Sequence, residues 1–91
     1  LPTQPSAEYV ASVEVISGAI SITYGGAAHA KLQGKTLLLT PAFGGQGEIG
    51  WACAYGEPPP GFEASMADYQ QYSDVEEKYL PPVCRPGGQS P

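Results

Sequence analysis

The sequence predicts a mainly β domain, a four-stranded antiparallel meander sheet followed by a C-terminal disulfide-bonded loop. Three observations support this fold class. Apolar and polar residues alternate with a period of two through the first half of the chain. Short glycine- and proline-containing segments separate the alternating runs. Two cysteines flank a proline-rich stretch. Because the chain has 91 residues, we expect a single domain over residues 1–91.

Four segments carry the strand signal, residues 8–16, 19–24, 36–40 and 49–53, and they make up the predicted sheet of residues 8–53. Ser17-Gly18 is a tight turn signal between the first two segments. Pro41 is expected to close the third strand, because proline cannot donate a ladder hydrogen bond. Trp51 is expected to be largely buried. The predicted core residues on these strands are Val13, Val15, Ile20, Ile22, Leu37, Leu39, Ile49 and Trp51.

The remaining segments lack alternation. Residues 1–7 contain two prolines and are predicted to be an irregular lead-in, and residues 86–91 are predicted to be a mobile tail. Residues 53–85 form the predicted loop. Phe62, Met66 and Tyr69 follow helical spacing there, and we expect these side chains to pack the loop onto the sheet.

Cys53 and Cys84 are the two cysteines. An even pair in a glycine- and proline-rich chain is typical of a disulfide formed in an oxidising compartment, although two free buried thiols would also fit. A Cys53–Cys84 bond would close a ring of about 30 residues and contribute about 3–4 kcal/mol in the chain-entropy model. So small a domain buries a modest core, which makes such a bond a main source of stability.

Charge and motifs exclude several functions. The net charge is −5, whereas nucleic acids and anionic membranes are bound by clustered Lys and Arg. The sequence has no nucleophile elbow, phosphate-binding loop or zinc-ligand spacing, so we expect no enzyme and no catalytic, cofactor-binding or metal-binding residues. His29 is interpreted as a surface residue. Oxygen atoms for calcium could come from Asp68, Asp74, Glu76 and Glu77, but their spacing does not match an EF-hand loop.

Segments of the chain in order resemble the globular headgroup of type IVa pilins. Three stretches resemble strands of the headgroup sheet in that family, residues 9–15, 20–25 and 34–41. Residues 49–53, Ile-Gly-Trp-Ala-Cys, resemble the strand that opens its disulfide loop. Residues 78–85, Lys-Tyr-Leu-Pro-Pro-Val-Cys-Arg, are similar to its Lys-Tyr-Leu-Pro-x-x-Cys-Arg ending. The intervening residues 54–77 are longer and more acidic than in the simplest members.

The resemblance implies a structural subunit of a type IV pilus, an extracellular cell-surface filament serving twitching motility, adhesion, biofilm formation or DNA uptake. Family members assemble through an N-terminal hydrophobic helix whose second half packs on the headgroup sheet. No such helix is recognisable in this sequence, so we expect a truncated pilin or the globular half of a split pilin. Its partners would be other pilin subunits and a pilin helix in cis or in trans, and it would meet the membrane through that helix before assembly.

The sheet also points to that helix, because its aligned apolar rows need a second layer and the loop can cover part of one face. Alternatives are a stand-alone secreted binding module, a DNA-capturing minor pilin and a conductive fibre. Lysine and arginine are too few and scattered for the second, and aromatic content does not by itself establish the third. Candidate surface-contact residues of the loop are Tyr69, Tyr72, Asp74, Glu76, Glu77, Lys78 and Tyr79.

Overall fold

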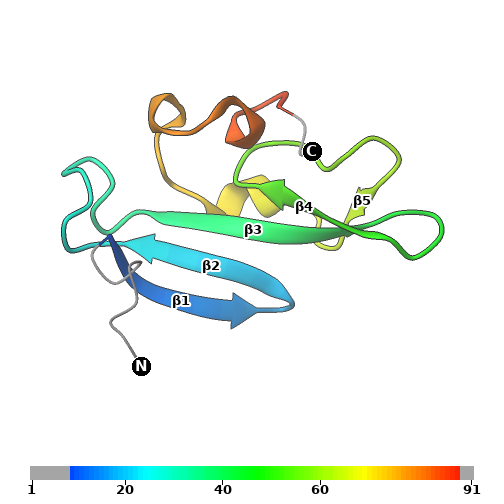
Figure 1. Cartoon of the computed structure of the whole chain (residues 1–91), viewed down its shortest axis with the longest axis horizontal. Coiled ribbons are helices and arrows are strands. Elements are labelled where there is room, and N and C mark those ends of the chain that lie inside the picture. The colour runs from blue at the N-terminus through cyan, green and yellow to red at the C-terminus, as the bar shows by residue number, and fades with distance from the viewer. Residues whose placement is uncertain (1–8, 89–91) are drawn as a thin grey trace.

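The computed structural model describes residues 9–88 and contains a twisted antiparallel sheet (Figure 1). Its main strands neighbour one another in chain order, β1 (Val10–Ile16), β2 (Ala19–Tyr24), β3 (Thr36–Phe43) and β4 (Ile49–Cys53). The predicted meander is therefore confirmed. A two-residue strand that the sequence did not predict, β5 (Glu63–Ala64), pairs with the end of β3. The expected lead-in and the last three residues of the expected tail lie outside the described residues.

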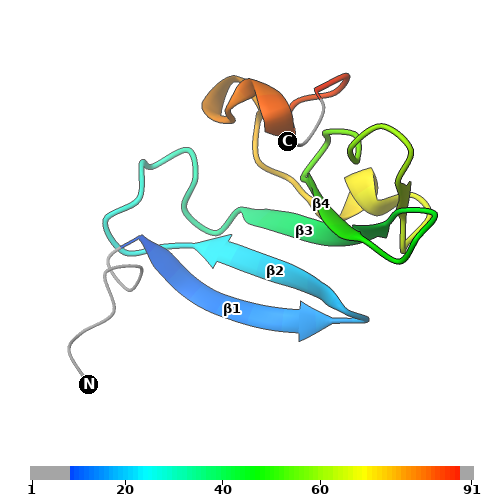
Figure 2. The same ribbon diagram turned by 45° about the vertical axis from the view of Figure 1, so that its right-hand side comes forward.

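The β1–β2 hairpin turns at Ser17 and Gly18, as the sequence predicts. Both residues have positive φ, 51° and 84°, which is the conformation of the tight turns whose twist matches paired strands. The turn brings Ile16 opposite Ala19 and sets the register of the hairpin. β1 pairs with β2 at the edge of the sheet. In Figure 2 this hairpin lies apart from the C-terminal loop.

The expected end of the third strand at Pro41 is wrong, because β3 runs on to Phe43. Pro41 lies beyond Leu39, the last residue of β3 that pairs with β2, because β2 begins at Ala19. Its missing N–H therefore removes no ladder bond to β2. Its carbonyl accepts a hydrogen bond from the Ser65 N–H at 2.8 Å, and β4 pairs along the opposite side of β3.

One face of the sheet, here the Tyr69 face, is covered by the first part of the loop. Tyr69 begins the short 3-10 helix η2 (Tyr69–Tyr72) and packs on Ala19, Leu38 and Ala52. Small side chains on the strands leave room for its ring, and its hydroxyl donates to the Gly56 carbonyl at 2.7 Å. Met66 packs against the same cluster, so the predicted packing role is confirmed for Met66 and Tyr69.

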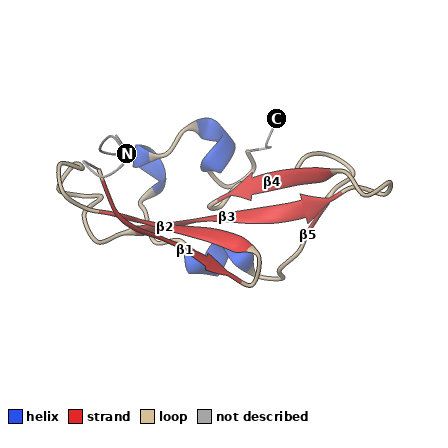
Figure 3. Cartoon of the chain, turned by 60° about the horizontal axis from the view of Figure 1, so that its bottom comes forward, coloured by secondary structure: helices blue, strands red, loops and turns tan. Residues whose placement is uncertain are grey.

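The opposite face, here the disulfide face, carries the bond between Cys53 and Cys84, whose Cα atoms lie 4.6 Å apart. Helices η3 (Glu77–Tyr79) and η4 (Pro82–Cys84) lie on this side, across the sheet from η2 (Figure 3). The predicted disulfide is confirmed. A Cβ at Gly56 would meet the Val83 carbonyl oxygen, so glycine allows the chain after β4 to approach η4 closely.

The disulfide brings the last part of the loop onto one end of the sheet. Leu37 on β3 forms a buried cluster with Val75, Leu80 and Cys84, and Ile22 and Leu39 pack at its margin. The expectation that the loop covers part of a sheet face is therefore confirmed. Within residues 9–88 the helices are short 3-10 turns, and none is long and apolar enough to cross a membrane.

Candidate assembly surface

The rest of the disulfide face, along β1 and around the β3–β4 turn, is bare. Val13 is 59% exposed, Val15 74%, Phe43 47%, Ile49 65% and Trp51 40%. We call these five residues the apolar strip. The predicted burial of Trp51 is therefore wrong for this chain, as is the core position of Val13, Val15 and Ile49, because the loop reaches only the end of the face around Leu37. Of the other predicted core residues, Leu37 is buried and Ile20, Ile22 and Leu39 are half-buried.

Strand register places the five side chains of the apolar strip on a single face. Val15, Ile20, Leu39 and Cys53 lie in one row across all four strands, and Val13 lies in the next row. On the opposite side of that row, Trp51 pairs with Pro41 and Ile49 pairs with Phe43. The strip therefore runs from the outer hairpin to the β3–β4 turn. Large contiguous apolar patches are uncommon on soluble monomers and usually mark an interaction site.

The residues predicted for surface contact divide between packing and solvent. Tyr69 is buried on the sheet, so its predicted place at the surface is wrong. Tyr79 is half-buried and packs against the His29 ring, with 5.3 Å between the ring centroids. His29 is exposed as expected, but the sequence did not reveal this contact. The exposed members of the set are Tyr72, Asp74, Glu76, Glu77 and Lys78.

Asp74 also has a structural task that its charge did not suggest. Its carboxylate accepts a hydrogen bond from the Thr36 N–H at 2.6 Å, and its own N–H donates to the Thr36 carbonyl at 3.0 Å. The neighbouring Ser73 hydroxyl accepts from the Leu38 N–H at 2.9 Å. These bonds complete the edge of β3 beyond the point where β4 ends, and they fix the loop to the sheet.

An open pocket of about 560 Å³ lies in this part of the loop, lined by Tyr55, Val75 and four charged residues, Asp74, Glu76, Glu77 and Lys78. The Tyr55 hydroxyl donates to the Ser73 and Val75 carbonyls at 3.0 and 2.7 Å. Burial, followed by the negative charges of Asp74 and Glu77, raises the pKa of Tyr55 above its ordinary value. Lys78 lies 3.7 Å from the Glu76 carboxylate in an exposed ion pair. The pocket is thus acidic, and its tyrosine serves the loop backbone.

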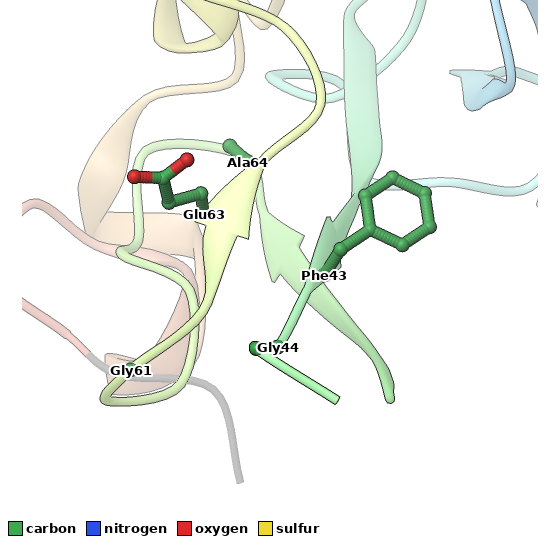
Figure 4. A pocket seen from close by; sticks show the side chains of 6 residues that line it. Phe43, Gly44, Gly61, Glu63 and Ala64 are labelled. Atoms are coloured by element: carbon green, nitrogen blue, oxygen red, sulfur yellow. The ribbon is translucent and has the colours of Figure 1, made fainter. Parts of the chain in front are cut away.

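A second open pocket, of about 410 Å³, lies between the β3–β4 turn and β5. Figure 4 shows that the Phe43 ring points away from the carboxylate of Glu63. Glycine backbone at positions 44, 45 and 61 and the methyl group of Ala64 form the rest of its lining. Glu63 is its one ionisable side chain, so the pocket offers no acid–base pair. Within residues 9–88, no cluster of three His, Cys, Asp or Glu residues could hold a metal ion.

A family model described as pilin, a bacterial filament protein, matches residues 1–85. No curated protein and no solved structure matches the chain. The match spans the whole sheet and the loop as far as Arg85, and thus includes the apolar strip and both cysteines.

Proposed function

Because the chain belongs to the pilin family, whose members are structural subunits of bacterial filaments, we propose that a pilin helix covers its apolar strip in the fibre. The helix is supplied either by the same polypeptide or, as in a split pilin, by a separate one. The globular domain then forms the outer part of an extracellular pilus, and its chemistry is assembly and surface contact.

The exposure of the apolar strip carries this proposal. A β-sheet needs a second layer on each apolar face, and the loop supplies that layer over the Leu37 and Tyr69 clusters but not over the strip. At about 25 cal/mol per Å², covering about 400 Å² would contribute roughly 10 kcal/mol before the costs of ordering. A contribution of this size favours a helix that is a permanent part of the subunit.

Trp51 gives a direct test, because it is the single tryptophan of the chain. We expect its fluorescence emission to lie at long wavelength in the isolated chain and to shift to shorter wavelength in assembled fibres. Accessibility to iodide quenching should fall in parallel. An unchanged spectrum and unchanged quenching in fibres would show that the strip remains in water, and would overturn the proposal.

Substitution of the strip separates assembly from folding. Trp51→Ser should leave the far-UV circular dichroism of the isolated chain nearly unchanged, because the side chain is already partly in solvent, and should strongly reduce the yield of fibres. Tyr72→Ser is the matched control, since Tyr72 is an exposed aromatic residue of η2. It should assemble normally. Equal fibre yields for the two variants would contradict the role of the strip.

With the strip covered, the exposed loop residues are left for outward contacts, and we assign to them the surface contacts of motility, adhesion or biofilm formation. Glu76, Glu77 and Lys78 are exposed in residues 9–88 and lie on η3 or directly before it. Fibres of Glu76→Gln/Glu77→Gln should form in normal amount, and they should bind positively charged beads less than parent fibres do, because two negative charges are removed. Equal attachment of variant and parent fibres to these beads would argue against this role.

A further inference from the structure

The outer edge of β1 is a second unpaired feature, distinct from the apolar strip. β1 ends the sheet, and within residues 9–88 its partner strand is β2. The two-residue turn makes Ile16 and Ala19 a hydrogen-bonded pair, so alternation directs the N–H and C=O groups of Ser12 and Glu14 toward β2. The backbone N–H and C=O groups of Val13 and Val15 consequently point away from the sheet.

This edge has few of the features that prevent pairing with another strand. Proteins blunt exposed edges with lysine, proline or a bulge. β1 reads Val-Ala-Ser-Val-Glu-Val-Ile, with no lysine or proline, and all residues from 11 to 16 are exposed. Its one irregularity is a shift of register between Val10 and Ser12. Residues 12–16 are thus a regular, exposed strand rich in valine, a residue favoured in sheets.

Charge selects how two such edges can meet. In an antiparallel pair of β1 strands, outward-pointing residues must oppose outward-pointing residues. A pairing centred on Glu14 would place the carboxylates of both copies directly opposite each other, which is destabilising. A pairing centred on Val13 instead places Glu14 opposite Ser12 of the second copy, and Val15 opposite Ala11. No like charges then face each other across the strands.

From these observations we propose that β1 pairs edge to edge with β1 of a second copy of this chain, antiparallel and with Val13 at the two-fold axis. The two sheets become one, and their disulfide faces remain on the same side. A two-fold contact of this kind closes at two copies, whereas a fibre grows by contacts that repeat without closure. The pairing therefore joins subunits of different fibres or free subunits, and does not depend on the helix that covers the apolar strip.

Cysteine cross-linking tests the register. Val13→Cys should form a dimer linked through residue 13 under mild oxidation, because residue 13 lies opposite itself. Val15→Cys is the matched control, on the same strand, face and edge. The two copies of residue 15 would lie about 13 Å apart, four residues along the strands, beyond disulfide reach. The masses of peptides from a digest made without reduction check that the Cys53–Cys84 bond is retained in both variants.

Two results would overturn the proposal. If both cysteine variants cross-link equally, the copies stack through their apolar strips and do not pair at the edge. If neither does so at high protein concentration, the edge does not self-associate.

Amide hydrogen exchange gives independent evidence. Exchange at Val13 and Val15 should slow by about tenfold or more between dilute and concentrated protein, while Ser12 and Glu14 are protected at both concentrations. Val13→Pro removes one outward N–H without removing a bond to β2, and should abolish the concentration dependence at Val15. Slow exchange at Val13 and Val15 in dilute protein would show that the edge is already paired within the chain, and would also overturn the proposal.

Discussion

Leu37 and Val15 lie on the same face of one sheet and in opposite environments. Leu37 is buried beneath Val75 and Leu80 of the loop, whereas Val15 is 74% exposed on the outer hairpin. Val15 belongs to an apolar row with a period of two, and Leu37 belongs to the continuous apolar run of residues 37–39. Alternation therefore determines which face a side chain occupies, but a second layer determines whether that face is buried. In this chain the disulfide decides where the second layer lies.

The largest effect on this contrast should come from breaking the disulfide. In Cys53→Ala/Cys84→Ala the unfolded chain regains the freedom of a loop of 31 residues, which should lower the free energy of unfolding by about 3–4 kcal/mol. The covered end should then exchange amide hydrogens like the bare end. Urea unfolding followed by circular dichroism measures the loss. A loss below about 1 kcal/mol would show that packing alone holds the loop.

Paired truncations compare the two ends directly. Leu80→Ala removes a side chain that is 4% exposed and packed in the cluster with Leu37, and should cost about 2–5 kcal/mol in the free energy of unfolding. Val15→Ala removes a mostly solvated side chain and should change it by about 0.5 kcal/mol or less. Equal losses in urea unfolding of the isolated chain would mean that the bare end is covered in solution.

Much of the fold could be predicted from the sequence because its determinants are local. Turn chemistry at Ser17-Gly18, alternation in three segments and the apolar run in residues 36–40 define the meander. The extension of β3 past Pro41 was missed, since it depends on where β2 turns back. β5 was missed because two residues carry no periodicity. Neither feature can be derived without knowing the strands that lie alongside.

The candidate surface was predicted less well, for a related reason. The sequence predicted apolar rows that require a second layer, and the apolar strip is that uncovered surface. It did not show which rows the loop would reach, so Trp51 was placed in the core. Tyr69 and Tyr72 look alike in a loop of tyrosines and acids. Small residues at Ala19 and Ala52 make room for Tyr69 alone, and these residues are far from it in sequence.

Tyr55 tests how the loop holds its shape over the covered end. Tyr55→Phe removes the hydroxyl proton that the Ser73 and Val75 carbonyls share, and should cost about 1–2 kcal/mol in the free energy of unfolding at neutral pH. The folded-state pKa of Tyr55 is raised above its ordinary value, first by burial and then by the negative charges of Asp74 and Glu77. The contribution of Tyr55 to the free energy of unfolding should therefore be complete below about pH 10, the ordinary pKa of tyrosine, and should fall as the pH rises through the folded-state pKa.

That alkaline loss should be smaller in Tyr55→Phe, which lacks the ionisable group. Urea unfolding of both proteins at neutral pH and above pH 10 measures the difference. Tyr72→Phe is the control, because Tyr72 is exposed on η2. If Tyr55→Phe and the parent protein lose equal stability at high pH, another group is responsible.

Thr40 sharpens the contrast from the opposite direction, because it lies on the covered part of the Tyr69 face. Its hydroxyl is fully buried and has no hydrogen-bond partner in residues 9–88. Thr40→Val keeps the shape and removes the unsatisfied group, so it should raise the free energy of unfolding by about 1 kcal/mol. Thr23→Val is the control, since the Thr23 hydroxyl lies 3.2 Å from that of Thr36. A destabilised Thr40→Val would indicate a bound water.

The smallest gain in stability is expected at the bare end, where β1 has little packing and its turn must hold the register. Ser17 adopts φ of 51° in that turn, a left-handed conformation that asparagine tolerates better. Ser17→Asn should raise the free energy of unfolding by about 0.5 kcal/mol and slow amide exchange at Ser12 and Glu14. Ser17→Val should do the reverse, because a β-branched residue is strained there, with a cost of about 1–2 kcal/mol. If neither variant changes exchange in β1, the side-chain contacts between β1 and β2 hold the register of the hairpin, and the turn does not.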